Sequence, residues 1–258
     1  MKVATWNVNS LRVRLPQVEE WLRRVAPDVL CLQETKVQDR DFPQEAFAAL
    51  GYQVVFHGQR SYNGVAIAAR GPLSDVSCGL QGFADEQCRA LSARYRGVRI
   101  ASLYVPNGTA LDSPRYPYKL DWLRALKAQA ALWLAEGPEL VLAGDFNIAP
   151  ADRDVYDPVA WVGSVLVSEP EREAFRALLT EGFADALGEL PGAEHGYTWW
   201  DYRAAAFRRD QGLRIDHILL SRVLAPRLIR AGVDRTPRAA SRPSDHAPVL
   251  AEVGEGTV

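Results

Sequence analysis

Acidic and amide side chains follow several apolar runs of this 258-residue sequence, at the points where those runs stop. Glu34, Asp145 and Asp245 are the clearest acidic examples, and Asn7 and Asn147 would complete a site around them. Mg²⁺ accepts carboxylate oxygens, and a carboxylate can take a proton from water, so these residue types suit metal-assisted hydrolysis. Polar groups that a sheet delivers to one edge can converge there. The pattern therefore predicts a hydrolytic centre.

Each of these residues also has a purely structural interpretation. Glu34 could simply pair with Lys36, and the Asp-x-Asn pair after Gly144 is common in turns whose side chains bond the backbone. Asp245 followed by His246 is compatible with a helix cap beside a solvated histidine. Five separate strand boundaries that all carry ligand-type residues are not expected of a scaffold alone, so the combination favours chemistry.

Regular elements must hold these residues in place, and hydrophobic periodicity predicts them. Short buried strands are expected at residues 3–8, 29–32, 52–56, 65–69, 90–95, 99–105, 140–143, 213–220 and 247–253. Helices are expected at 15–25, 116–135 and 169–179. Helices alternate with strands at both ends around a strand-rich middle, which predicts sheet layers covered by helices in one α/β domain over residues 1–258.

Composition limits the classes of partner. Lys and Arg total 30 against 32 Asp and Glu, which gives a formal charge of -2. No global positive field marks the chain as a nucleic-acid binder, so any such binding must use a local patch. No apolar run approaches the ~20 residues needed to cross a bilayer, and the first residues show no signal-peptide pattern. We therefore expect a cytoplasmic protein with no membrane partner.

Five segments carry a family resemblance. They are Trp-Asn-Val-Asn-Ser-Leu-Arg at 6–12, Leu-Gln-Glu-Thr-Lys at 32–36, Gly-Asp-Phe-Asn-Ile-Ala-Pro at 144–150, Gly-Leu-Arg-Ile-Asp at 212–216 and Pro-Ser-Asp-His-Ala-Pro at 243–248. In this order the chain resembles the exonuclease III family of apurinic/apyrimidinic endonucleases. The resemblance implies a four-layered α/β sandwich of two packed mixed sheets flanked by helices, like deoxyribonuclease I and the endonuclease/exonuclease/phosphatase superfamily.

The resemblance also implies a metal centre that uses Mg²⁺, with Mn²⁺ as a substitute. Glu34 resembles the metal-binding glutamate of the family, and Asp245 a further carboxylate at or near the metal. Asp145 resembles the residue that orients or deprotonates the attacking water. Asn147 and Asn7 resemble its supporting amides, with Asn7 also close to the metal.

Three more residues are implied to act on the phosphate. His246 resembles the phosphate-contacting histidine, Asp216 the carboxylate that orients its imidazole, and Tyr104 the active-site tyrosine of the family. The physical roles are consistent with phosphodiester hydrolysis, which needs hydrogen-bond donors at the oxygens where charge accumulates. A carboxylate beside an imidazole favours the charged imidazolium, which suits contact with a phosphate.

A separate set of residues is implied to recognise DNA. The resemblance makes Trp199 a wall of the pocket that accepts an extruded abasic sugar, with Leu213 and Ile215 as partners. An apolar slot of this kind excludes a complete nucleotide by size and accepts a deoxyribose without its base. Tyr62 and Arg89 lie in segments that resemble DNA-contacting loops. The alternative for Trp199 is an ordinary core position.

The sequence thus predicts a hydrolase of base excision repair. It is expected to incise duplex DNA 5′ to abasic sites and to have 3′–5′ exodeoxyribonuclease and 3′-phosphatase or 3′-phosphodiesterase activity. Its expected substrate is double-stranded DNA with abasic sites or blocked 3′ ends, bound by a monomer. Two alternatives stay open: a phosphoesterase of the same fold that acts on an RNA 3′ end or an inositol phosphate, and a DNA-binding module without catalysis.

Overall fold

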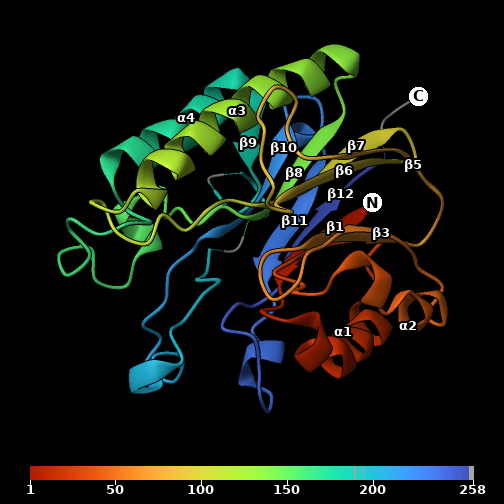
Figure 1. Ribbon diagram of the computed structural model, residues 1–258, viewed down its shortest axis with the longest axis horizontal. Helices are drawn as coiled ribbons and strands as arrows, with labels where there is room; N and C mark the ends of the chain where they lie inside the picture. The colour runs from red at the N-terminus through yellow and green to blue at the C-terminus, as the bar shows by residue number, and fades with distance from the viewer. Residues whose placement is uncertain (189, 194, 256–258) are drawn as a thin grey trace.

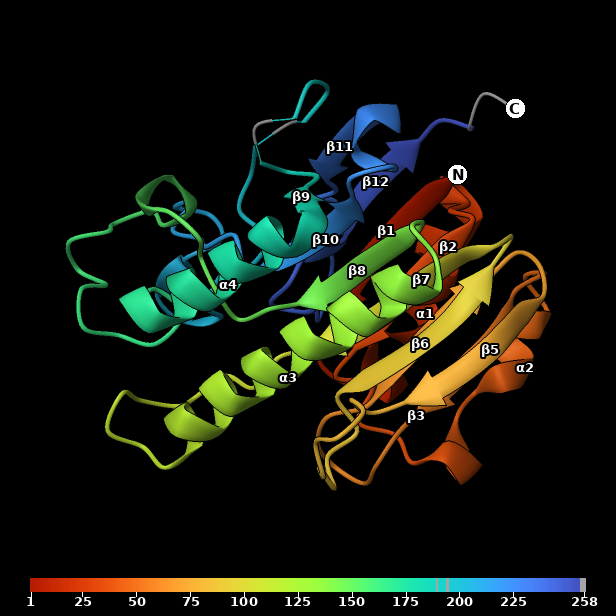
Figure 2. The same cartoon turned by 90° about the horizontal axis from the view of Figure 1, so that it is seen from above.

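The fold has four layers, in which two sheets pack face to face and helices cover both outer faces (Figure 1). A computed structural model describes residues 1–188, 190–193 and 195–255. Helices α1 (Leu11–Val25) and α2 (Gln44–Ala48) cover one sheet, and α3 (Arg115–Glu136) and α4 (Glu169–Gly182) lie side by side on the other (Figure 2). This arrangement confirms the predicted sandwich. Within the described ranges, no helix has the length and apolar character of a membrane span.

The first sheet has six strands in the order β11-β12-β1-β2-β4-β3. Their bounds are β1 Lys2–Asn7, β2 Val29–Gln33, β3 Gln53–His57, β4 Val65–Ala69, β11 Leu228–Val233 and β12 Val249–Val253. Strands β1 and β2 are parallel, whereas the other neighbours are antiparallel. The carboxyl ends of β1 and β2 therefore meet at the same edge of the sheet.

The second sheet also has six strands, in the order β5-β6-β7-β8-β10-β9. Their bounds are β5 Leu73–Cys78, β6 Ala90–Tyr95, β7 Val98–Tyr104, β8 Leu140–Asp145, β9 Phe183–Asp185 and β10 Asp216–Ser221. Strands β7 and β8 are parallel, and β10 runs antiparallel to β8 so that Asp216 pairs with Asp145. The end of β8 and the start of β10 therefore share one edge.

Apolar side chains fill the space on both faces of each sheet. Val3 and Cys31 belong to the core between the sheets, together with Ile100 and Val141 of the second sheet. The alternate residues of β1 point outward, where Trp6 packs against helix α1. Strands buried on both faces read as continuous apolar runs in the sequence, which explains why these strands are short, apolar and polar only at their ends.

The structure adds elements that periodicity did not predict. Strands β5, β9 and β11 and helix α2 are absent from the prediction, because β5 is largely exposed, β9 has three residues, β11 alternates poorly and α2 has five residues. The expected strand 213–220 begins instead at Asp216, and the expected strand 247–253 begins at Val249, just after a proline that cannot donate to a ladder. Short 3₁₀ turns occupy Asp39–Asp41, Asp152–Asp154, Arg203–Ala205, Ala225–Arg227 and Pro237–Ala239.

Candidate active site

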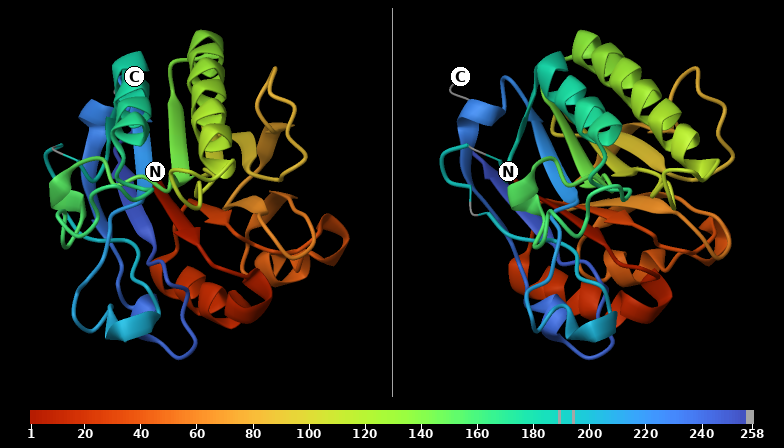
Figure 3. Two further views of the ribbon diagram at one scale, coloured as in Figure 1. Left: turned by 60° about the vertical axis from the view of Figure 1, so that its left-hand side comes forward. Right: turned by 90° about the vertical axis from the view of Figure 1, so that its left-hand side faces the viewer.

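Both sheets deliver polar residues to one end of the sandwich. Asn7 ends β1 and Glu34 directly follows β2, while Asp145 ends β8 opposite Asp216, the first residue of β10. His246 lies in the segment that enters β12 and forms a bridge with Trp199. The loops between strands gather at this end of the molecule, which faces the viewer in the right-hand view of Figure 3. The register of strand pairing therefore brings together residues from separate parts of the chain.

Asn7 connects two of the carboxylates. Its side-chain nitrogen donates to Glu34 Oε1 and to Asp145 Oδ2, both at 2.9 Å. Its side-chain oxygen accepts the backbone N–H of Asn9 at 2.9 Å. This orientation turns the amide nitrogen toward the acidic groups, so Asn7 holds the carboxylates in place and does not present an oxygen to a cation.

His246 is buried against two carboxylates. Its Nδ1 lies 2.8 Å from Asp216 Oδ2, and its Nε2 lies 3.8 Å from Asp145 Oδ2. Burial works to lower the pKa of His246, but the charges of Asp216 and Asp145 outweigh it and raise the pKa to about 10. The imidazole is therefore charged at neutral pH, and its Nε2 carries a proton that can be donated to an anion.

Backbone bonds fix the position of this histidine. The Trp6 indole donates to the His246 carbonyl at 3.2 Å, and the His246 N–H donates to Ser244 Oγ at 3.2 Å. The Ser244 hydroxyl in turn donates to the Asn7 carbonyl at 2.6 Å. The residues Asp245 and His246 thus do not cap a helix, and the solvated histidine of the structural interpretation is wrong, since His246 is 4% exposed.

Asp145 has a carboxyl group whose ionisation is poised near neutrality. Burial raises its pKa, His246 lowers it and Asp216 raises it again, with a result of about 7. Its Oδ1 accepts the backbone N–H of Asn147 at 2.9 Å, which is the turn that the structural interpretation anticipated. A carboxyl group with a pKa near the working pH suits proton transfer from a water molecule.

Asn147 and Tyr104 border the same acidic centre. The Asn147 amide donates to the Val105 carbonyl at 3.0 Å, and its oxygen accepts from Asn107 at 3.1 Å. Tyr104 lies opposite Asp145 in the strand register. Burial, followed by the negative charges of Glu34 and Asp145, raises the pKa of Tyr104 well above its ordinary value. The phenol therefore keeps its proton and is a hydrogen-bond donor at any physiological pH.

The acidic groups have the chemistry of a cation site. Oxygens of Glu34 and Asp145 and a ring nitrogen of His246 all lie within 4.8 Å of one another. Since His246 is charged and Asn7 points its nitrogen inward, the donors left for a hard cation are carboxylate oxygens, chiefly of Glu34 and Asp145. Glu34 also pairs with Lys36, whose Nζ lies 2.9 Å from Oε2.

Asp245 lies beside this centre but is not one of the three close groups. Its two oxygens accept from Asn9 Nδ2 and from the Trp199 indole, each at 3.0 Å. Burial works to raise the pKa of Asp245, but the charge of His246 and these hydrogen bonds outweigh it, so its pKa lies below the ordinary value. Asp245 is therefore a charged carboxylate that orients Trp199.

A pocket of about 200 Å³ opens onto the centre. Its lining consists of Glu34, Tyr104, Asn107, Asp145, Asn147, Leu166, Trp199, Ile215, Asp245 and His246. Trp199, Ile215 and Leu166 form the apolar wall, and the ring of Trp161 meets that of Trp199 edge-on at 6.5 Å. Leu213 does not line the pocket. It is fully buried behind the wall, in the same apolar cluster as Ile215.

A groove of about 440 Å³ adjoins the pocket, and the two share Tyr104 and Asn107. Tyr62 and Arg89 both line this groove, and Tyr62 is 71% exposed. The Arg89 guanidinium lies 4.8 Å from the centre of the Tyr104 ring. Tyr62 and Arg89 thus lie next to the acidic centre without touching it, whereas Trp200 is fully buried and belongs to a separate core cluster.

Three residues that line or support the pocket, Asn107, Leu166 and Thr198, were not predicted from the sequence. Asn107 lies three positions after Tyr104, which the family resemblance did identify, so the same stretch of sequence could have suggested it. Leu166 lies in a predicted loop and gave no signal, yet its backbone has φ of +75°. Thr198 accepts the N–H groups of Ile215 and Asp216, both at 3.0 Å, which fixes the start of β10.

Several residues at this edge have a strained backbone. Asn9, Ser10, Glu34, Lys36 and Asn147 are non-glycine residues with positive φ, between +43° and +86°. Such conformations cost of order 1–3 kcal/mol each and persist where the surrounding structure imposes them, often at functional sites. The strain is consistent with a site selected for geometry.

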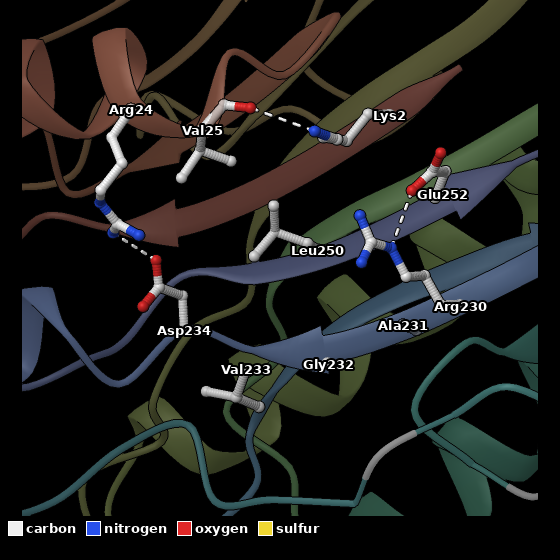
Figure 4. A pocket seen from close by; sticks show the side chains of 10 residues that line it. All are labelled: Lys2, Arg24, Val25, Arg230, Ala231, Gly232, Val233, Asp234, Leu250 and Glu252. Atoms are coloured by element: carbon white, nitrogen blue, oxygen red, sulfur yellow. Dashed lines mark hydrogen bonds and ion pairs between the residues drawn. The ribbon is translucent and has the colours of Figure 1, made fainter.

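A second hollow, of about 350 Å³, extends along β11 and β12, from Glu252, which pairs with Lys2, to Asp234, which lies beside Pro248 (Figure 4). The charged side chains around it are paired with each other or with the backbone. Arg24 lies 2.5 Å from Asp234, Arg230 lies 2.8 Å from Glu252, and Lys2 donates to a backbone carbonyl. The Arg230–Glu252 pair faces solvent, whereas the Asp234 side chain is 14% exposed, and each carboxylate of the hollow has a basic partner.

Comparisons with known proteins agree with this geometry. The sequence profile of the endonuclease/exonuclease/phosphatase family matches residues 4–246. Exodeoxyribonuclease III of Haemophilus influenzae is 33% identical over 265 residues, which cover 98% of this chain and 99% of that protein. A 3′ phosphatase from Neisseria bound to a product DNA hairpin superposes with a TM-score of 0.96 at 47% identity, covering 99% of this chain and 100% of the other. An AP endonuclease from Archaeoglobus fulgidus has a TM-score of 0.92 at 40% identity, covering 98% and 99%.

Proposed function

This chain belongs to the endonuclease/exonuclease/phosphatase family, and from that premise we propose that it is a metal-dependent DNA repair nuclease. Its proposed reactions are incision of duplex DNA 5′ to an abasic site and hydrolytic processing of 3′ ends. The observation that carries the proposal is the buried set of Asp145, His246 and Asp216 beside Glu34, with an apolar-walled pocket of sugar size next to it.

The proposed roles follow from the protonation states. Asp145, with a pKa of about 7, accepts the proton of the attacking water. His246, held by Asp216 and charged, donates a hydrogen bond to a phosphate oxygen on which negative charge accumulates. Tyr104 and Asn147 border the same space and supply further neutral donors. Together these groups bind the phosphate and move one proton without any covalent intermediate on the protein.

We propose Mg²⁺, with Mn²⁺ as a substitute, as the cation of this site. Glu34 would hold it, with Asp145 and Asp245 as the neighbouring carboxylates, since Mg²⁺ takes oxygen ligands and usually only one or two carboxylates. A bound divalent cation neutralises charge on the phosphate. Asn7 then acts by positioning Glu34 and Asp145, since its nitrogen faces both of them.

The pocket supports selectivity for a sugar without a base. Its volume of about 200 Å³ is below the ~300–1,000 Å³ of typical small-molecule sites. Trp199 and Ile215 would contact the extruded deoxyribose, and Leu213 would support them from behind. Tyr62 and Arg89 would contact the DNA backbone along the adjoining groove. We further propose that residues 1–258 form one domain that acts as a cytoplasmic monomer.

A specific observation supports 3′-end processing as a major activity. The Neisseria structure that is 47% identical to this chain is a 3′ phosphatase bound to product DNA. A terminal phosphate needs only the acidic centre and not the sugar pocket. Processing of 3′ ends could therefore proceed even where the pocket limits entry of an internal abasic site.

Two duplexes test the proposal. One carries a single tetrahydrofuran abasic analogue, and the other ends in a 3′-phosphate. Each is incubated with Mg²⁺ or with excess chelator. We expect a nick with a 3′-hydroxyl on the first duplex, release of inorganic phosphate from the second, and neither product with chelator. Absence of both reactions in Mg²⁺ would refute the proposed function, and hydrolysis of inositol phosphates alone would favour the alternative within the fold.

A further inference from the structure

A fully buried ion pair lies behind the pocket. Lys119 of α3 and Glu171 of α4 both have side chains that are 0% exposed, and Lys119 Nζ lies 2.5 Å from Glu171 Oε1. Neither residue lines the pocket or the adjoining groove. The pair joins two helices that lie side by side in Figure 2.

Lys119 binds the two loops that carry the pocket asparagines. Its ammonium group donates to the Asn147 carbonyl at 2.6 Å and to the Asn107 carbonyl at 3.2 Å, in addition to Glu171. These three acceptors match the three donors of a lysine ammonium. Since Asn107 and Asn147 also bond to each other through their side chains, one buried charge fixes both asparagines from behind.

Glu171 binds the segment that forms the apolar wall. Its Oε1 accepts the backbone N–H of Leu166 at 2.9 Å. Its Oε2 accepts the N–H of Ser168 at 3.0 Å and the Ser168 hydroxyl at 2.5 Å. Leu166 has a positive φ, a conformation that leucine rarely adopts. The carboxylate therefore holds a strained residue of the pocket in place.

Stability alone does not account for this pair. Taking two charges out of water costs several kcal/mol per ion, and apolar residues of similar volume are often equally or more stabilising. What an apolar pair cannot do is accept and donate the five hydrogen bonds that Lys119 and Glu171 make to the loops. We propose that Lys119 and Glu171 are positioning residues, which hold Asn107, Asn147 and Leu166 in the geometry required for hydrolysis.

This proposal rests on the proposed function, so activity and fold are measured separately. The variants are Lys119→Met, Glu171→Leu and their combination, assayed for melting temperature and for kcat and KM on the abasic and 3′-phosphate duplexes. We expect each single variant to lower the melting temperature and the double variant to recover most of it. The double variant should nevertheless keep kcat at least about tenfold below wild type, with KM changed less than threefold.

A matched control exists on the same two helices. Lys127 and Glu181 form a partly exposed pair at 3.6 Å, away from the pocket. Lys127→Met with Glu181→Leu should leave kcat unchanged. Recovery of kcat in step with the melting temperature in the Lys119 and Glu171 double variant would overturn the proposal and make the pair purely structural.

Two further measurements keep the test decisive. If Glu171→Leu or the double variant does not fold, Glu171→Gln is used in its place. This variant retains an oxygen acceptor and the shape of the side chain but removes the charge, and it should lower kcat with little effect on KM. A crystal structure of the double variant should show the backbone at Asn107 and Asn147 displaced by more than ~0.5 Å, the tolerance of a productive site. An unchanged backbone at Asn107 and Asn147 would overturn this proposal. Inactivity of the wild-type protein on both duplexes would instead refute the proposed function alone, and the crystal structure would still decide whether the pair positions the loops.

Discussion

Charged side chains are arranged differently at the two ends of strands β1 and β12. Lys2 and Asn7 mark these ends on β1 and are about 16 Å apart, at ~3.3 Å per residue. At the Lys2 end, Glu252 lies opposite Lys2 in the strand register and forms a solvent-facing pair with Arg230, beside the hollow of Figure 4.

At the Asn7 end, several carboxylates are buried around one imidazole. Asp145 is 1% exposed and Asp216 is 0% exposed, and both lie within 3.8 Å of His246. Size does not distinguish the two groups of charges, since the hollow of about 350 Å³ is larger than the pocket of about 200 Å³. The difference is that one end neutralises its charge in an exposed pair, whereas the other buries several carboxylates around one imidazole. Perturbed ionisation in a cleft indicates function, whereas paired surface charge does not.

The largest expected effect comes from replacing Asp145, the group that we propose takes the proton of the attacking water. Asp145→Asn keeps the shape of the side chain but removes its basicity, so kcat on the abasic duplex should fall by about 10²–10⁴. Glu252→Gln is the matched change at the other end and should alter kcat less than twofold. Both are measured under single-turnover conditions in Mg²⁺. Near-normal incision by Asp145→Asn would assign the base to another residue.

A smaller effect is expected at the wall of the pocket. Trp199→Ala removes the ring that would contact the abasic sugar, so abasic incision should fall about tenfold, or ~1.4 kcal/mol. Hydrolysis of a terminal 3′-phosphate should fall less, because it does not require the sugar pocket. The two rates are compared on the same preparation. Equal losses on both substrates would make Trp199 a packing residue that also orients Asp245 through its indole.

The stability of the protein in chelator, measured at several pH values, tests the difference between the two ends of β1. The pKa of Asp145 is raised from 3.8 to about 7 by burial, an effect that His246 only partly offsets. A raised folded-state pKa means that the contribution of this carboxyl to folding is lost as the pH rises through 7. Asp145→Asn should therefore raise the melting temperature at pH 8, by ~2–4 °C for each kcal/mol gained. The gain should shrink as the pH falls toward 5.

The control for this pH series is again Glu252→Gln, whose effect on the melting temperature should not change between pH 5 and pH 8. Differential scanning calorimetry in chelator measures both variants. A lower melting temperature for Asp145→Asn than for wild type at pH 8 would mean that the buried carboxylate stabilises the fold, and the two ends would no longer differ in the way described.

Much of the active end could be predicted from sequence because strands end where apolar runs end. Glu34, Asp145 and Asp216 each occupy such a boundary, and parallel or antiparallel registers bring boundaries together. The orientation of Asn7 could not be predicted, because it depends on which neighbour its oxygen accepts from. Leu166 was missed for a similar reason, since its place in the wall depends on a buried carboxylate and not on its own segment.

The other features that were not predicted from the sequence have no periodic hydrophobic pattern that could indicate them. Strand β5 is largely exposed and rich in small polar residues, so no alternation predicts it. The Lys119–Glu171 pair joins residues 52 positions apart, and nothing in either helix distinguishes a buried charge from the solvated charges that helices usually carry. Only packing reveals which charges are enclosed, which is also what separates the two ends of β1.

The smallest effect is expected at the paired end and provides the baseline for the comparison. Arg230 and Glu252 have side chains that are 72% and 34% exposed, and exposed ion pairs typically contribute ~0–1 kcal/mol. A double-mutant cycle with Arg230→Ala and Glu252→Ala, measured by urea unfolding, should therefore give a coupling energy below about 1 kcal/mol, with unchanged kcat and KM on both duplexes. A coupling above ~2 kcal/mol, or a change in kcat, would show that charge at this end is neither weakly coupled nor independent of the active end. The contrast between the ends would then have to be sought in their geometry and not in how each one balances its charges.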